Sequence, residues 1–582
     1  MTSPFPDDVF DLAEVARAVA REEPERVAVV APAGRDARGR RRYRRHTYLE
    51  LSRDVESLAP GLRELGIREG TRTVFLAPPS YEASVACLAL TRVGALQIWI
   101  DPSVGLRNVG ERLRRVEPEA FVGIPLAHLG RVAFGWGPRW LDKAVAVRGR
   151  FPGAHSLEAL KRAPPESPAP PAVSADDPVA IFYTTGSTGP AKPTLYLHRN
   201  LSAMYRLAHR VFGFGRDGVE ELPVDMAVFP AFFTIPLSAG GTMVVPPIDF
   251  ARQTPGKADP AALLEVINDT GTRSLFGSPV LLENLGRHAV ARGLRAPSLR
   301  WVVGGGAPIY ESMTRDLLAT MGDGGEVYAD YGATEVLPAT EMRGRDALEG
   351  AFGQTAQGDG ICVGAAHPGV ELRVIRIVDG PLESFDEVEP LPPGEVGEII
   401  VKAAHVSPAY FGDSKNTEKH KIADAGGFYH RLGDAGYLDE SGRLWYLGRV
   451  SQRVKLAGAP LFSLECEPLF DAHPAVLRSG LVGVPGVGGE VPVICVEVRG
   501  GRAADETQLR AELLELAARH PATASIRHVL FHPKLPTDPR HDSKIERRAL
   551  AEWAAARLPS SEPSPRGPES RGRGARRAVG RG

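Results

Sequence analysis

Two spacings of apolar residues alternate along the first hundred positions of the chain. The runs "RVAVVAP" (26–32), "TVFLAPP" (73–79) and "LQIWIDP" (96–102) are short and apolar, which is typical of buried strands. Between them, "TYLELSRDVESLAPGLRELGI" (47–67) and "YEASVACLALTRVGA" (81–95) carry apolar residues at helical spacing. This alternation predicts an α/β fold built on layers of largely parallel sheet.

The pattern changes in the last third of the chain. From about Glu371, strands and tight turns such as "ELRVIRIVDG" and "GEVGEIIVKA" follow one another, and a compact piece with its own apolar pattern begins after Arg449. We therefore predict a large domain over residues 1–448 and a small α+β domain over residues 449–558. Residues 559–582 are basic and lack the apolar residues that order a chain, so we expect a disordered tail.

One long uncharged stretch, residues 226–248, has the length of a membrane span. Four prolines and a Gly-Gly pair interrupt "MAVFPAFFTIPLSAGGTMVVPPI", and these residues break helices. We interpret the stretch as buried core and pocket wall, and we expect no membrane span.

Composition narrows the class of protein. The 582 residues are 43% hydrophobic and 24% charged, as in ordinary globular proteins, and a formal net charge of -1 argues against a nucleic-acid binder. Four scattered cysteines form no CxxC pair, which suits a reducing cytoplasm. The arginine-rich run at residues 35–45 is interpreted as a solvated loop between two strands.

A glycine-rich loop follows an apolar run in "YTTGSTGPAKPTLYLH" (183–198). Glycines let successive N–H groups point at one anion, and the neighbouring hydroxyls and Lys192 add donors and positive charge. The spacing is not that of a Walker A loop. A nucleotide phosphate site and an ordinary polar turn both fit this loop alone.

Four further features suit nucleotide chemistry. "GGGAP" (304–308) follows an apolar run and would let a flat base approach the backbone, and "YGATE" (331–335) ends in Glu335, whose carboxylate could hold Mg²⁺. Asp434 could accept hydrogen bonds from ribose, although a turn or cap is the ordinary role of such a residue. Lys544 precedes a predicted terminal helix.

In this order the motifs resemble the acyl-adenylate-forming superfamily of acyl-CoA synthetases, luciferases and nonribosomal peptide adenylation domains, from about residue 10 to about residue 558. The resemblance implies an adenylating-enzyme fold with a mobile C-terminal lid, and ATP and Mg²⁺ as cofactors. It implies catalytic roles for Thr184, Lys192, Glu335 and Lys544, with Glu335 also the metal ligand. It implies nucleotide binding by Thr185, Gly186, Ser187, Thr188, Gly189, Gly304, Gly305, Gly306, Ala307, Pro308, Tyr331, Gly332, Thr334, Asp434 and Arg449.

Three positions depart from the superfamily pattern. The loop ends Ala191-Lys192-Pro193 where Pro-Lys-Gly is usual, and Pro193 removes a backbone donor. Ser451 stands where the hinge usually carries an Asp or Lys. Phe233 stands where the pocket motif often has a histidine.

Several segments are similar to the olefin β-lactone synthetases, among them "GDGICVGAAHPGVELRVIRIVDGPL" and "LPTDPRHDSKIERRALAEWAA". That resemblance implies activation of a 2-alkyl-3-hydroxy fatty acid as acyl-AMP and closure to a β-lactone. A long alkyl chain needs an apolar wall, for which we expect Phe229, Phe232, Phe233 and Ile235. The implied partners are a condensing enzyme, a reductase and a β-lactone decarboxylase of the same pathway. An acyl-CoA or acyl-AMP ligase, and a non-catalytic nucleotide-binding assembly protein, stay open as alternatives.

Overall fold

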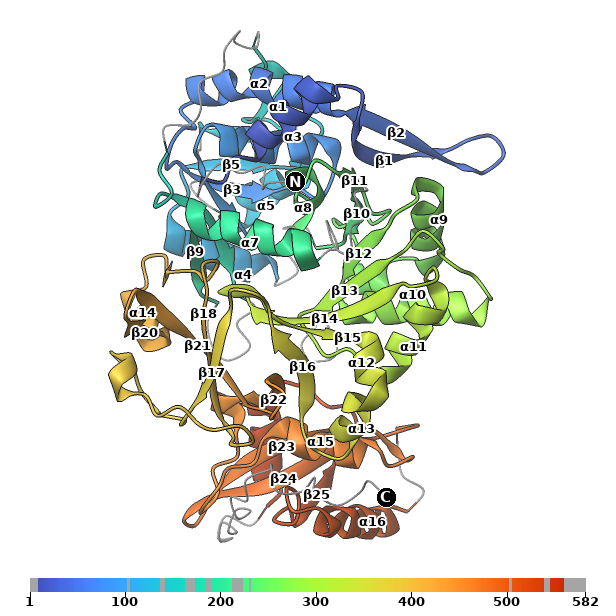
Figure 1. Ribbon diagram of the computed structural model, residues 1–582, viewed down its shortest axis with the longest axis vertical. Coiled ribbons are helices and arrows are strands. Elements are labelled where there is room, and N and C mark those ends of the chain that lie inside the picture. The colour runs from blue at the N-terminus through green and yellow to red at the C-terminus, as the bar shows by residue number, and fades with distance from the viewer. Residues whose placement is uncertain are drawn as a thin grey trace. The chain divides into compact units, whose positions relative to one another are not determined.

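The computed structural model describes residues 9–101, 105–136, 142–162, 173–184, 191–211, 223–229, 232–501, 505–537 and 545–558. The chain divides into two compact units, Met1–Pro338 with Ala403–Thr417, and Ala339–Lys402 with Glu418–Gly582. Their strands and helices confirm the predicted α/β class (Figure 1). The predicted domain boundary at residue 449 stays a prediction.

The first unit contains an eight-stranded sheet whose central strands are parallel. Its strands run in the order β19 (Ala409–Tyr410), β9 (Pro193–Leu197), β8 (Pro178–Tyr183), β4 (Leu96–Trp99), β3 (Arg72–Leu76), β5 (Ala120–Gly123), β6 (Ala144–Ala146) and β7 (His155–Ser156). Buried residues such as Val74, Ile98 and Ile181 form its core. Among these described strands, only the β8–β9 and β9–β19 pairs are antiparallel. The glycine-rich loop follows β8, which is parallel to β4, and ligands commonly bind at the carboxyl ends of parallel strands.

A second set of strands in this unit carries the other half of the core. Its order is β2 (Arg41–Thr47), β1 (Val27–Arg35), β11 (Thr242–Val244), β10 (Val224–Ala227), β12 (Ser274–Gly277), β13 (Trp301–Gly305) and β14 (Glu326–Ala333). The helices of the unit are α1 (Leu12–Glu22), α2 (Tyr48–Glu64), α3 (Tyr81–Arg92), α4 (Leu106–Val116), α5 (Pro125–Phe134), α6 (Leu157–Leu160), α7 (His198–Val211), α8 (Ile235–Ser238), α9 (Pro260–Thr270), α10 (Pro279–Ala291) and α11 (Glu311–Thr320). The uncharged stretch supplies β10, α8 and β11, and Met226 and Val244 are buried in the core. Among the described residues, no helix is long and apolar enough to cross a membrane.

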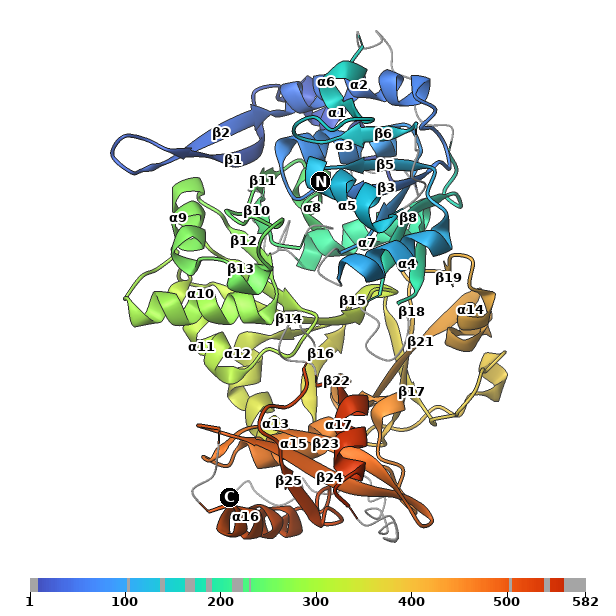
Figure 2. The same cartoon turned by 180° about the vertical axis from the view of Figure 1, so that it is seen from behind.

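The arginine-rich run is a loop between two strands only in part, because residues 41–45 belong to β2. β1 and β2 form a hairpin that extends as an arm (Figures 1 and 2), and only residues 36–40 connect its strands. Arg35 donates from both terminal nitrogens to Glu265 of α9 at 2.7 Å, and Arg41 reaches the same carboxylate at 2.9 Å. Tyr43 donates to Asp269 at 2.8 Å. Part of the basic charge is therefore matched within the unit, because strand pairing turns these side chains toward an acidic helix.

The second unit holds an antiparallel group of strands and a smaller three-stranded sheet. The first group is β17 (Glu371–Ile375), β18 (Gly397–Lys402), β21 (Gly427–Leu438), β22 (Arg443–Arg449) and β16 (Ile361–Ala366), with β20 (Lys421–Asp424) beside β21. The smaller sheet is β23 (Val476–Gly486), β24 (Gly489–Val498) and β25 (His528–Phe531). β15 (Val336–Arg343) and α14 (Ser414–His420) each begin in the first unit and end in the second.

Alternation along β23 and β24 builds two cores, one on each face of the three-stranded sheet. Leu481 and Ile494 pack with α15 (Ser463–Asp471) and α16 (Glu506–Arg519). Their strand neighbours Val482 and Val493 pack with α17 (Arg547–Ala555), which lies in front of the sheet in Figure 2. Successive strand residues face opposite ways, so the same two strands serve both cores. Every buried member of both clusters lies within residues 454–558.

The core between α16 and the sheet gives a first testable prediction. Leu513 is 0% exposed within it, whereas Leu477 on β23 is 45% exposed. Leu513→Ala should lower the free energy of unfolding by about 2–5 kcal/mol, since it leaves a cavity, and Leu477→Ala should change it by less than about 0.5 kcal/mol. Chemical denaturation followed by circular dichroism measures both, and equal losses would contradict this assignment of the core.

Candidate functional site

Thr184 and Lys192 close the base of the glycine-rich loop. Tyr183 and Pro193 pair across β8 and β9, and the Thr184 N–H donates to the Lys192 carbonyl at 3.1 Å. The Lys192 N–H donates in turn to Thr184 Oγ1 at 3.0 Å. Pro193 is the first residue of β9, a position where a strand tolerates proline. The predicted phosphate-binding residues Thr185, Gly186, Ser187, Thr188 and Gly189 lie outside the described residues.

Tyr410 connects two residues that the sequence placed in separate motifs. Its hydroxyl donates to Glu335 Oε1 at 2.5 Å and accepts from Lys192 Nζ at 3.4 Å. The Lys192 ammonium also lies over the Tyr410 ring, 4.9 Å from the centroid. Glu335 is 6% exposed and Tyr410 is 3% exposed. The structure thus brings Lys192 and Glu335 to one buried hydroxyl, which sequence reasoning missed because "SPAYFGD" has no motif that marks its tyrosine.

Residues 403–417 and strand β9 hold the backbone around Glu335 in place. The Ser407 N–H donates to the Glu335 carbonyl at 2.9 Å, and the Tyr196 hydroxyl donates to the Thr334 carbonyl at 2.9 Å. His405 Nε2 lies 2.9 Å from the Pro338 carbonyl oxygen. Burial lowers the pKa of His405 to about 4, so this imidazole is neutral at pH 7 and donates from Nε2.

The three glycines at the end of β13 differ in how strongly their surroundings require glycine. A Cβ on Gly304 would lie 2.6 Å from Ile309 Cδ1, whereas one on Gly305 would meet Asp330 O at 3.5 Å and Phe276 Cε2 at 3.8 Å. Gly306 has a φ of +85°, which favours glycine. The segment thus presents bare backbone next to the aromatic ring of Phe276. The remaining residues predicted near the base, which are Ala307, Pro308, Tyr331 and Gly332, are half-buried on the same segment and on β14.

The four residues predicted to line the acyl pocket fall into two groups. The rings of Phe229 and Phe232 lie 5.2 Å and 5.0 Å from the ring of Phe276, and both side chains are half-buried. Phe233 and Ile235 are each 1% exposed, and the Phe233 ring packs 6.2 Å from Trp99. The first pair therefore lies half-buried around Phe276, while the second pair is enclosed in the core. Phe276 was not predicted, since "SLFGSP" looks like any buried strand.

In the second unit, Asp434 and Arg449 face each other on paired strands. Their residues are directly opposite in β21 and β22, and Arg449 Nη1 lies 2.9 Å from Asp434 Oδ1. The same guanidinium nitrogen donates to the Leu432 carbonyl at 2.9 Å. The guanidinium therefore forms an ion pair with a carboxylate that is buried. Lys544 lies outside the described residues.

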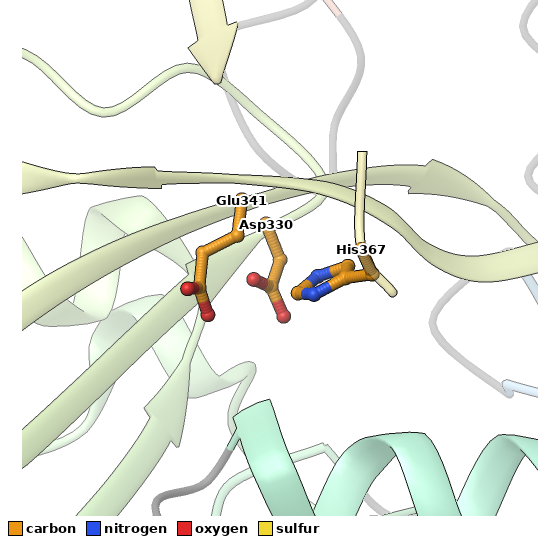
Figure 3. Close-up of side chains that lie close together, drawn as sticks. All are labelled: Asp330, Glu341 and His367. Atoms are coloured by element: carbon orange, nitrogen blue, oxygen red, sulfur yellow. The ribbon is translucent and has the colours of Figure 1, made fainter. Parts of the chain in front are cut away.

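Figure 3 shows carboxylate and imidazole side chains that lie close together. Of these, Glu341 and His367 belong to the second unit. A carboxylate oxygen of Glu341 and a ring nitrogen of His367 lie within 4.8 Å of each other. Both groups are metal ligands in other proteins, but they also form ordinary ion pairs, so this pair by itself does not define a metal centre.

Comparisons with known proteins place the site in a chemical context. The family model described as AMP-binding enzyme matches residues 16–411. The chain is 36% identical over 548 residues to the olefin beta-lactone synthetase of Stenotrophomonas maltophilia (strain K279a), covering 93% of this chain and 97% of the relative. A second olefin beta-lactone synthetase, from Xanthomonas campestris pv. campestris, is 36% identical over 92% of this chain and 96% of its own. In structure, the chain is similar to ATP-bound MatB from Rhodopseudomonas palustris, with a TM-score of 0.70 and 23% identity over 93% of this chain and 99% of that one.

The buried imidazole of His405 gives a prediction for pH. Unfolded histidine takes up a proton near pH 6.5, but the folded protein resists it until about pH 4. The unfolded state therefore binds more protons over this window, and the free energy of unfolding decreases as pH falls through it. Between pH 7 and pH 5 the His405→Gln variant should lose about 2 kcal/mol less than the wild type. Denaturation at both pH values tests this, with exposed His155→Gln as the control that should follow the wild type.

Proposed function

This chain belongs to the family of AMP-binding enzymes, and from that premise we propose that it converts a 2-alkyl-3-hydroxy fatty acid and ATP into a β-lactone, AMP and pyrophosphate. The chain is an AMP-forming ligase. The finer proposal rests above all on the identity of 36% with an olefin beta-lactone synthetase over 93% of this chain.

In the first step, an oxygen of the substrate carboxylate attacks the α-phosphate of ATP and pyrophosphate leaves. Catalysis of such a transfer is mainly positioning and stabilisation of charge. We assign the outer phosphates to Lys192 and to the loop that Thr184 closes. Lys192 is well suited because its backbone is pinned at the base of the loop while its ammonium group points to Tyr410 and Glu335.

The residues at this place also fit a magnesium ion. Glu335 is a buried carboxylate with one oxygen accepting from Tyr410, and a carboxylate has a second oxygen with further acceptor capacity. Hard cations prefer such ligands. Glu335 would hold Mg²⁺, which when bound neutralises phosphate charge.

We propose that residues 304–308, Tyr331 and Gly332 bind adenine, because glycine leaves the end of β13 open to a flat ring. Thr334 would contact the phosphates. Asp434 would accept from the ribose hydroxyls, with the ion pair to Arg449 orienting that carboxylate.

In the second step, the substrate's own 3-hydroxyl oxygen attacks the acyl carbonyl, AMP leaves, and the hydroxyl proton is released. Nucleophile and electrophile belong to one molecule, so no second substrate has to be captured. Phe229 and Phe232, with Phe276, would hold the alkyl chain so that a reactive conformer persists. Cleavage of the reactive acyl phosphate bond drives the formation of the strained ring.

The cellular setting is a further part of this proposal. Cys87, Cys362, Cys466 and Cys495 are all buried and form no disulfide among the described residues, which suits the reducing cytoplasm. Assembly with a condensing enzyme, a reductase and a β-lactone decarboxylase stays a prediction.

Product analysis tests the proposed reaction. Purified protein, ATP, Mg²⁺ and a 2-alkyl-3-hydroxy fatty acid should yield a β-lactone and AMP without CoA, and proton NMR of the ring hydrogens reports it. The matched acid without the 3-hydroxyl should release pyrophosphate but form no lactone. A product that appears only with CoA, as a thioester, would replace the lactone synthetase with an acyl-CoA ligase.

Lys544 gives a prediction for the first step. If its ammonium meets the charge that develops at the α-phosphate, Lys544→Ala should slow pyrophosphate release by about 10²–10³-fold and leave ATP binding nearly intact. Stopped-flow detection of pyrophosphate measures the rate, and exposed Lys534→Ala serves as the control. Pyrophosphate release at the wild-type rate would remove Lys544 from the site.

A further inference from the structure

The hydroxyl of Tyr410 lies between a cation and an anion that the proposed function assigns to one nucleotide. Lys192 Nζ donates to it at 3.4 Å, and it donates to Glu335 Oε1 at 2.5 Å. We propose that Tyr410 is a positioning residue that keeps Lys192 and Glu335 apart, so that the ammonium stays available to phosphate and the carboxylate to Mg²⁺. This inference rests on the proposed function and adds a residue to it.

The chemistry of the three groups fixes the direction of both hydrogen bonds. An ammonium group can only donate and an ionised carboxylate can only accept, whereas a phenol does both. The Tyr410 oxygen therefore accepts a hydrogen bond from Lys192 and donates one to Glu335. Hydrogen bonds to ionised partners are stronger than neutral ones, so the hydroxyl holds each charged group in its place.

Tyr410 is fixed by its backbone rather than by this hydroxyl. Its N–H donates to Thr417 Oγ1 at 3.0 Å, and it pairs with Thr194 across β19 and β9. The next N–H, that of Phe411, donates to the Pro193 carbonyl at 2.8 Å. A phenylalanine at position 410 would thus keep its place, its packing and the ring face beneath the Lys192 ammonium.

Removing only the hydroxyl would change the electrostatics of the site. Glu335 is buried. Leaving a buried carboxylate without its donor costs free energy, which favours a new contact with another donor. The nearby Lys192 ammonium carries the opposite charge, so the two groups would draw together in a direct ion pair. ATP and Mg²⁺ would then have to break that pair before binding, which weakens binding more than it slows the chemical step.

The experiment compares Tyr410→Phe with a matched Tyr→Phe control. Tyr43 also donates its hydroxyl to a carboxylate, that of Asp269 at 2.8 Å, but on the arm. In ATP–pyrophosphate exchange, Tyr410→Phe should raise the KM for ATP by about tenfold and raise the half-saturating Mg²⁺ concentration. Its kcat should stay within about threefold of the wild type, because the residue touches no reacting atom. Tyr43→Phe should leave all three unchanged.

A double variant shows whether the effect passes through Lys192. In a Lys192→Ala background, adding Tyr410→Phe should raise the KM for ATP far less than it does in the wild type, because the ion pair can no longer form. Equal increases in both backgrounds would overturn the proposal. So would an unchanged KM, or a loss of kcat alone that follows a lowered Tm, since those are the marks of a purely structural role.

The two levels of inference fail in different ways. A wild-type protein that releases no pyrophosphate from ATP with any 3-hydroxy acid would overturn the proposed function. A wild type that turns over normally beside an indistinguishable Tyr410→Phe variant would overturn only the role of Tyr410.

Discussion

The pairing of two residues, Ala409 and Tyr410, with the edge of β9 determines where the charged groups of the candidate site lie. Lys192 directly precedes β9, and β19 sets Tyr410 beside it. The segment that contains β19 also reaches Glu335 through the Ser407 N–H and Pro338 through His405. Backbone hydrogen bonds cannot be satisfied by small sideways shifts, so this register fixes a lysine, a tyrosine and a glutamate drawn from three distant parts of the chain.

The periodicity of apolar residues was enough to predict the α/β class and most of the first elements. "TYLELSRDVESLAPGLRELGI" forms α2 and "TVFLAPP" forms β3, because amphipathic and buried patterns are local signals. Within the arginine-rich run, the partner of Arg35 and Arg41 was not predicted, since both residues look solvated in the sequence and Glu265 of α9 lies beside them only in the fold. That partner is more than two hundred positions away, and no local pattern carries such information.

The residues of the candidate site also divide into those that a local motif predicts and those that depend on distant neighbours. Lys192, Glu335 and Asp434 were predicted because each sits in a short motif with recognisable chemistry. Tyr410 and Phe276 were not, because their importance comes from strand neighbours: β9 for the first and β13, with Gly305, for the second. Burial divides the four residues of the predicted acyl wall into two pairs. The sequence could not make this division, since an apolar run alone does not distinguish the half-buried Phe232 from the enclosed Phe233.

The chain passes between its two compact units at Pro338, at Lys402 and at Thr417. Residues 403–417 return to the first unit after a long excursion in the second, and they supply the last strand of its eight-stranded sheet. A fragment that stops at Pro338 would keep most of that unit's core but would leave one side of β9 without its partner. An open strand edge is a site of aggregation, so the unit cannot be obtained by a single cut. A shorter chain would have to join residue 338 to residue 403, which would restore both the covered edge of β9 and Tyr410 beside Lys192.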